Sequence, residues 1–480
     1  MSRNKGPQIN NTSRTFTTRD SVGIEGIANT ISADLCPVVN TVTPRPYYWA
    51  FITWCYWKYY QAFGIIKDDE VKEFIRKQNY FISLGNLIAG NNVVGGFTGI
   101  TNIESRNDLQ QESFAYINDY IAGIGAMGYY IPGLETMDLV TRQDVRNGIV
   151  VETFKEPHLK APRATDLAEA FDSVISSTEY YKQYLFENSV PRDVLKKLGN
   201  TVQIDMKGFD ECKRLLIQYL FERDRLEKCK NYILWIKDKC GIEASSLDIC
   251  RKVFFDTFSP RADNNELDLS LKDTSRGWEV LVARQYFTLA LEVIWTYMMN
   301  QLMEPMTKTE WISCCINRQV FSYDINSPLN TIVADSRKNA AEIEQLFAEE
   351  RSAKDKRSFE RGLTILLSVY NRLNQRKDFN EHQLKYFDYG TGGSVSFNEV
   401  FKVIEDYKNR PIKDFLAYIM LHFLINQHLQ TAFGKMLDNR DGYYIQEMDG
   451  KYIAVREYGW FFQGNRMVQL YSVMKDLDVI

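Results

Sequence analysis

The chain has 480 residues and a formal net charge of −4, with 45% hydrophobic and 25% charged residues. These values are ordinary for a globular protein and exclude a disordered, collagenous or coiled-coil chain. The slightly acidic balance argues against a protein that coats nucleic acid through bulk charge, but it leaves room for a local basic patch. Aromatic residues reach 13% while prolines number only 12, and the low proline content favours a helix-rich fold.

The first nineteen residues are polar and lack the apolar core of a signal peptide. They contain no acidic residue and four basic ones, so we expect a basic arm: Arg3, Lys5, Arg14 and Arg19. The eight cysteines form no C-x-x-C pair and match no zinc-finger spacing. We therefore expect small buried thiols in a reducing compartment, and a cytoplasmic protein.

The N-terminal part, residues 1–205, is predicted to be a helical domain. Three prolines interrupt the chain after its first helix, at Pro37, Pro44 and Pro46. The apolar spacing predicts helices at Ile24–Leu35, Tyr47–Phe63, Val71–Ala89, Ser113–Met127 and Ala164–Phe186.

One segment, Tyr47–Ile66, has the length and apolar character of a membrane span. Ten of its twenty residues are aromatic, mostly Tyr and Trp, which prefer the interfaces of a bilayer to its centre. Lys58 would also lie in the middle of the span at an energetic cost. We therefore expect a buried helix and no membrane association.

Residues 206–385 are predicted to form a central helical domain. Phe209–Cys240 has helical spacing with a break near Asp224, and Val280–Met303 is a long apolar helix. Asp335–Arg361 carries 14 charged residues of both signs in 27. This run fits an exposed helix with i,i+4 ion pairs, and alternatively a surface that a partner recognises.

Residues 386–480 are predicted to form a winged-helix-like domain. Helices at Ser396–Tyr407 and Ile412–Leu437 precede a β-hairpin, Tyr443–Tyr458, which turns at Asp449-Gly450. A short helix, Arg466–Leu477, closes the chain. Alternation predicts that Ile453 and Val455 pack on the second helix while Lys451 and Arg456 point outward. The fold class is thus mainly α, a multi-domain helical protein with a C-terminal winged-helix-like hairpin module.

No pattern in the chain satisfies the requirements of a catalytic, cofactor or metal site. The glycine-rich loops Gly95–Gly99 and Gly390–Ser394 lack the lysine of a phosphate-binding loop. The four histidines are scattered along the chain. An acidic stretch could suggest a nuclease metal site, yet it lies in a polar segment without the expected strand: Asp263, Glu266, Asp268, Lys272 and Asp273.

Four arginine and lysine side chains are the candidate contacts to a partner or to DNA. Lys451, Arg456 and Arg466 belong to the predicted winged-helix-like module, where acidic residues lie between the basic ones. Arg45 follows two proline breaks and could be presented to a partner or could cap the following helix internally. Docking of a protein partner through the wing is the first interpretation and direct DNA contact the second.

Four blocks of sequence carry a family resemblance: SVGIEGIANTISADLCPVVNTVTPRPYYWAFITWCYW (Ser21–Trp57), LLIQYLFERDR (Leu215–Arg225), ARQYFTLALEVIW (Ala283–Trp295) and GNRMVQLYSVMKDLDVI (Gly464–Ile480). Together they resemble a family of prokaryotic proteins from anti-phage and anti-plasmid defence operons, whose nearest functional analogue is the accessory subunit of Lamassu-type systems. The resemblance implies an SMC-like, DNA-sensing ATPase and a nuclease effector as partners, and it transfers no catalytic residue.

Three functions from different classes follow. The first is a non-catalytic accessory or scaffold subunit that bridges the ATPase and the effector, reaching DNA only through the complex. The second is a DNA-binding regulator that acts through the winged helix, which salt-dependent DNA affinity of the isolated chain would support. The third is a divergent metal-dependent nuclease, which magnesium-dependent DNA degradation lost on Asp268→Ala would support.

Overall fold

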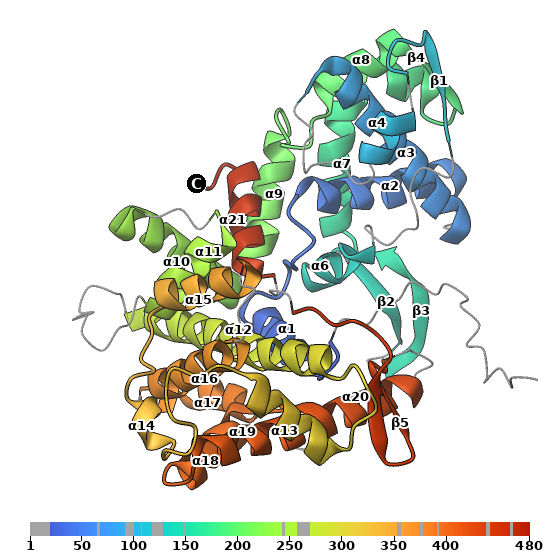
Figure 1. Cartoon of the computed structure of the whole chain (residues 1–480). Helices are drawn as coiled ribbons and strands as arrows, with labels where there is room; N and C mark the ends of the chain where they lie inside the picture. The colour runs from blue at the N-terminus through green and yellow to red at the C-terminus, as the bar shows by residue number, and fades with distance from the viewer. Residues whose placement is uncertain are drawn as a thin grey trace, which may run out of the picture. The chain divides into compact units, whose positions relative to one another are not determined.

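A computed structural model shows a chain that is mainly helical (Figure 1). It describes residues 20–64, 68–91, 100–106, 108–117, 128–146, 149–241, 245–256, 269–352, 357–374, 378–390, 393–437, 442–460 and 464–480. Several predicted features lie outside these residues: the basic arm, the loop Gly95–Gly99 and most of the acidic stretch around Asp263.

The chain folds as two compact units, and each is assembled from separate segments. Unit 1 comprises Met1–Ile31, Arg251–Asp263 and Arg276–Gln463, and unit 2 comprises Ser32–Cys250, Asn264–Ser275 and Gly464–Ile480. This division differs from the three consecutive domains expected from the sequence, because each unit draws on distant parts of the chain. Three helices run across the unit boundaries: α1 (Glu25–Leu35), α11 (Leu247–Asp256) and α12 (Leu269–Gln301).

The helices of unit 2 agree with most of the sequence expectations. Helix α2 has the predicted bounds, and the predicted break near Asp224 separates α9 from α10. The C-terminal helix α21 also belongs to this unit. The bounds are α2 (Tyr47–Phe63), α3 (Asp68–Ala89), α4 (Ile100–Arg106), α6 (Ile131–Thr136), α7 (Arg163–Ile175), the π-helical η2 (Tyr180–Tyr184), α8 (Arg192–Thr201), α9 (Asp210–Phe221), α10 (Asp224–Cys240) and α21 (Arg466–Asp476).

The aromatic helix α2 lies in the core of unit 2, as its composition predicted. Trp54 is fully buried, and its ring lies 5.2 Å from that of Phe171 on α7. The indole Nε1 donates a hydrogen bond of 2.8 Å to Oδ1 of Asp172, so the polar edge of the buried ring is satisfied. Within the described residues, no helix has the length and apolar character needed to cross a membrane.

Two glycines allow α3 and α8 to touch through their backbones. A Cβ added to Gly199 would lie 2.1 Å from the carbonyl oxygen of Gly85, and one added to Gly85 would lie 2.6 Å from the carbonyl oxygen of Leu195. Any larger residue at either glycine would force the two helices apart. The contact explains why glycine, which weakens helices, is used within both.

Unit 2 also contains two antiparallel strand pairs. Strand β1 (Ser113–Ala115) pairs with β4 (Ser189–Pro191), and β2 (Val140–Arg146) pairs with β3 (Ile149–Leu159). The prediction of a helix beginning at Ser113 was therefore wrong, because pairing with a distant segment overrides the local preference. The sequence does carry a signal for the second pair, since an Asn147-Gly148 dipeptide separates its strands.

Helix α12 is the central element of unit 1. Between Trp278 and Met299 it is buried on nearly all sides, and most of its side chains there are apolar. Its side chains meet aromatic residues of three other helices, Trp311, Phe359 and Phe397. The surrounding helices are α13 (Lys308–Arg318), α14 (Asn330–Val333), α15 (Ala340–Ser352), α16 (Ser358–Asn374), α17 (Glu381–Asp388) and α18 (Phe397–Tyr407).

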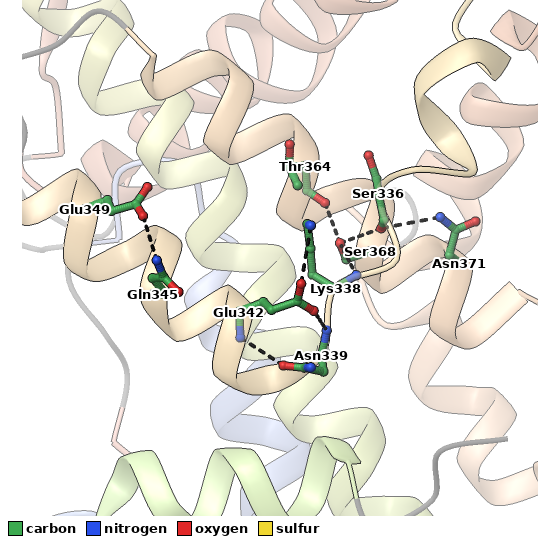
Figure 2. A network of polar contacts seen from close by, with 9 residues as sticks. All are labelled: Ser336, Lys338, Asn339, Glu342, Gln345, Glu349, Thr364, Ser368 and Asn371. Carbon is green, nitrogen blue, oxygen red and sulfur yellow. Dashed lines mark hydrogen bonds and ion pairs between the residues drawn. The ribbon is translucent and has the colours of Figure 1, made fainter. Parts of the chain in front are cut away.

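The described residues of the charged run Asp335–Arg361 contribute to α15 and the start of α16, and their charged side chains range from exposed, as at Glu349, to buried, as at Arg361. Figure 2 shows the segment before α15 joined to α16, where the hydroxyl of Ser368 donates to the carbonyl of Ser336 at 2.6 Å. The i,i+4 pair Lys338–Glu342 is present at 3.4 Å. The carboxylate of Glu344, however, binds the buried guanidinium of Arg251 at 2.5 Å. The run is thus partly an internal polar layer.

The C-terminal part of unit 1 has the predicted order of elements with one interruption. The predicted helix Ile412–Leu437 consists of α19 (Ile412–Tyr418), the π-helical η3 (Ile419–Asn426) and α20 (Gln427–Leu437). A π turn takes more residues than an α turn, so it rotates the faces of α20 relative to those of an uninterrupted helix. The hairpin of β5 (Ile445–Met448) and β6 (Lys451–Ala454) follows.

The hairpin turns at the predicted dipeptide but buries the opposite face. Asp449 and Gly450 both have positive φ, of 53° and 75°, as a type I′ turn requires. Ile445 and Tyr452 are buried, whereas Val455 is 43% exposed. The prediction that Ile453 and Val455 pack inward was wrong. Met306 pairs with Tyr452 through two backbone hydrogen bonds and so fixes the orientation of the hairpin.

Replacing the buried tryptophan of α2 tests the packing of unit 2. Trp54→Ala is expected to lower the free energy of unfolding by about 3–5 kcal/mol, because it leaves a large cavity and removes one hydrogen bond to Asp172. Urea denaturation of the full chain would measure this change. The matched control, Tyr60→Ala on the exposed side of the same helix, should change stability by no more than about 0.5 kcal/mol. Equal effects of the two variants would contradict the assigned orientation of α2.

Candidate interaction surface around helix α20 and hairpin β5–β6

Two of the four candidate contact residues make bonds inside unit 2. Nη1 of Arg45 donates to both carboxylate oxygens of Asp476 on α21, each at 2.9 Å. Nη1 of Arg466 donates to the carbonyl oxygens of Cys36 and Val39 at 2.9 and 2.8 Å. Burial lowers the pKa of Arg466 and raises that of Asp476. Both arginines thus fasten α21 to the segment that precedes α2.

The other two candidate residues lie on the hairpin of unit 1. Lys451 is exposed beside the turn, and Arg456 is half-buried just beyond the end of β6. The outward face of the hairpin also carries Met448, which is 60% exposed and lies opposite Lys451. This face therefore combines basic and apolar side chains.

Helix α20 presents a second group of exposed apolar side chains. Phe433, Met436 and Leu437 are 53%, 47% and 67% exposed, and Leu429 is half-buried. At 100° per residue these four positions fall within about 100° of the helix circumference, so they form one stripe. We call this stripe the outer face of α20. Its sequence pattern is that of a core-facing helix, and only the tertiary structure reveals that it is exposed.

The opposite side of α20 is polar and binds a strap of backbone, Asp20–Gly23. The carbonyl groups of Asp20, Ser21 and Val22 accept hydrogen bonds from the side chains of Lys435, His428 and Thr431, respectively. The carbonyl of Gly23 accepts a bond of 2.6 Å from the hydroxyl of Ser394. Four consecutive carbonyls are thus satisfied by side chains distant in sequence. The helix has its usual polarity reversed, with polar groups inside and apolar groups outside.

His428 is the centre of this arrangement. It is fully buried, and its ring lies 5.2 Å from that of Trp295 on α12. The backbone N–H of Tyr444 donates to Nε2 at 3.3 Å, so the proton is on Nδ1, which donates to the carbonyl of Ser21 at 2.7 Å. Burial lowers the pKa of His428 to about 4, and Lys435 adds to the decrease while the bond to Ser21 opposes it. The imidazole is therefore neutral at pH 7.

The buried side of the hairpin is held by Tyr452. Its hydroxyl donates to Glu447 at 2.6 Å across the strand pair. Burial, together with this carboxylate, raises the pKa of Tyr452 to about 12. The ammonium group of Lys308 lies 5.4 Å from the centre of the same ring. These contacts anchor the inner side of the hairpin and leave Met448 and Lys451 outward.

Among the described residues, no group of three or more His, Cys, Asp and Glu side chains is arranged to hold a metal ion. Seven cysteines are free thiols, and of these all but Cys314 are buried: Cys36, Cys55, Cys212, Cys229, Cys250, Cys314 and Cys315. Burial raises the pKa of Cys315 and of Cys36, which keeps these two thiols protonated.

The chain was compared with protein-family models, with curated proteins and with solved structures, and none of the three comparisons found a significant match.

The neutral His428 predicts a specific loss of stability at acid pH. Its folded pKa of about 4 lies below the usual value of about 6.5, so the unfolded chain binds more protons between these values. The contribution of His428, about 3 kcal/mol, is present above pH 6.5 and is lost as the pH falls toward 4. Urea denaturation at several pH values would measure it.

The variant His428→Phe removes this titration and should lose less stability than the natural chain between pH 7 and pH 4.5. The control His422→Phe, at an exposed position of η3, should keep the full pH dependence. If both variants follow the natural chain over this range, the buried neutral imidazole is not the group responsible.

Proposed function

We propose that this protein is a non-catalytic accessory or scaffold subunit of a prokaryotic anti-phage or anti-plasmid defence complex. It would bridge an SMC-like, DNA-sensing ATPase and a nuclease effector, act in the cytoplasm and need no cofactor of its own. The family resemblance of the sequence blocks motivates the identity of the complex. The observation that carries the interaction role is the exposed outer face of α20, and the outward face of the hairpin offers a second exposed surface in the same unit.

The outer face of α20 is suited to the apolar stripe of a partner helix. Leu429, Phe433, Met436 and Leu437 follow the i, i+4, i+7, i+8 spacing by which one helix packs on another. Each large side chain withdrawn from water there contributes about 1.5–3 kcal/mol. The proposed occupant is an amphipathic helix of another subunit of the same complex.

The hairpin supplies the polar part of the proposed interface. Lys451 and Arg456 would meet acidic side chains of the partner, or DNA phosphates held by the complex, in the manner of the wing of a winged helix. Arg45 and Arg466 are assigned a structural role in this proposal, because both are engaged inside unit 2. The winged-helix-like character of residues 386–480 belongs to the same proposal.

Co-purification of the products of the native operon tests the apolar part of the interface. The double variant Phe433→Asp, Met436→Asp should lose the partner subunits while its Tm stays close to that of the natural chain, because both side chains are already in contact with water. A matched control is Leu384→Asp, which changes a similarly exposed leucine on α17. Retention of all partners by the double variant, or equal loss in the control, would contradict this surface.

Charge reversal on the hairpin tests the polar part. Lys451→Glu combined with Arg456→Glu should weaken assembly or DNA association, and the defect should be greatest at low ionic strength, where surface charges are least screened. The Tm should fall little, since the exposed charge of Lys451 contributes little to stability and Arg456 is only half-buried. Affinity measured by titration at two salt concentrations is the readout. Normal assembly by this variant would leave the hairpin a purely structural element.

A further inference from the structure

The strap Asp20–Gly23 is held more tightly than a connecting segment needs to be. Besides its four carbonyl bonds, it contains Gly23 with a positive φ of 74°, and a Cβ there would lie 2.5 Å from Oγ1 of Thr431. The backbone of the strap therefore lies directly against α20. Only glycine fits this position without displacing the strap.

Electrostatics add to the attachment of the strap. The guanidinium group of Arg284 on α12 is fully buried between the rings of Phe287 and Phe397, and burial lowers its pKa to about 9. None of its nitrogens has a hydrogen-bond partner within the described chain. Asp20 of the strap and Glu399 on α18 are the acidic groups that stabilise its charge. Release of the strap would remove one of these two compensating charges from a buried cation.

His428 hydrogen-bonds both the strap and the start of the hairpin, and Tyr458 beyond β6 also interacts with Ser21 of the strap. His428 donates to the carbonyl of Ser21 through Nδ1 and accepts from the N–H of Tyr444, next to β5, through Nε2. The ring of Tyr444 in turn meets that of Tyr458 beyond β6, with centroids 5.3 Å apart. A neutral imidazole can make both bonds only when strap and hairpin are positioned on either side of it.

We infer that the docked strap sets the position of hairpin β5–β6 through His428, so that release of the strap loosens the hairpin. The inference rests on the proposed function only in taking the hairpin and the outer face of α20 as the interaction surface. Under that proposal the strap regulates the surface: partner binding is favoured while the strap is docked and weakened when it is released.

Hydrogen exchange of the full chain, read by mass spectrometry on peptides that cover residues 20–31 and 442–458, tests the coupling without any partner. Gly23→Ala should displace the strap and accelerate exchange in both peptides, with at least a roughly tenfold effect at the hairpin. The matched control is Gly26→Ala in α1, where an added Cβ meets nothing within 4 Å. This control should leave the hairpin peptide unchanged.

The variant His428→Phe distinguishes coupling through the imidazole from a general loosening of unit 1. In the His428→Phe background, addition of Gly23→Ala should still accelerate exchange of the strap peptide but should have no further effect on the hairpin peptide. Equal additional acceleration of the hairpin in both backgrounds would overturn the role of His428. A freed strap with unchanged hairpin exchange would overturn the coupling itself.

A milder variant covers the case in which Gly23→Ala fails to fold. Thr431→Val keeps the shape of the side chain and removes the hydroxyl that donates to the carbonyl of Val22 and accepts from the amide of Gln427, so it should produce a smaller change in the same two peptides. Partner capture by the same variants then tests the regulatory part. If the hairpin loosens and partner subunits are still captured, regulation of the surface is rejected and the coupling stands. If only the outer-face variants lose the partner subunits, the result supports the proposed function and not the regulation.

Discussion

The neutral imidazole of His428 joins three segments of unit 1 that are far apart in sequence. Its two nitrogens bind the strap and the hairpin, and its ring packs on Trp295 of the central helix α12. A protonated ring could not accept the N–H of Tyr444, so the arrangement requires the low pKa that burial imposes. This contact links the hairpin and α20 to the strap, while the pairing of Met306 with Tyr452 orients the hairpin.

Unit 1 buries an unusual number of charged groups around α12, and most are compensated by a partner on another helix. Glu279 is fully buried between Arg276 and Arg372, with distances of 2.9 and 2.8 Å. Arg251 likewise pairs with Glu344 on α15. Such pairs add little net stability, but breaking one leaves a buried charge, so they favour one arrangement of the helices over others. Under the proposed function, this selectivity would keep the interaction surface in a fixed geometry.

Helix α20 connects the packing of unit 1 with the proposed interaction role. Because its polar side chains are used to bind the strap, its apolar side chains are left to face solvent. An exposed apolar stripe is costly for an isolated chain and is typical of a surface that a partner covers. The same helix thus carries the internal attachment of the strap on one side and the proposed partner contact on the other.

The sequence by itself determined the elements that depend on near neighbours. The helix Tyr47–Phe63 has its predicted bounds, and the turn at Asp449-Gly450 is where the dipeptide placed it. Helical spacing and turn chemistry act within a few residues, so they can be read directly from the chain. The candidate residues Lys451 and Arg456 on the hairpin were accessible to the same reasoning.

Only the tertiary structure decided which faces are buried. The pairing of Met306 with Tyr452 orients the hairpin so that Val455 faces outward. The strap binds the polar side of α20, and this side is therefore the buried one. The strand at Ser113 likewise depends on a partner strand far along the chain. Periodicity shows that a helix or strand has an apolar and a polar face. Contacts with segments distant in sequence determine which of the two faces is buried. The free energy of these long-range contacts cannot be read from the local sequence.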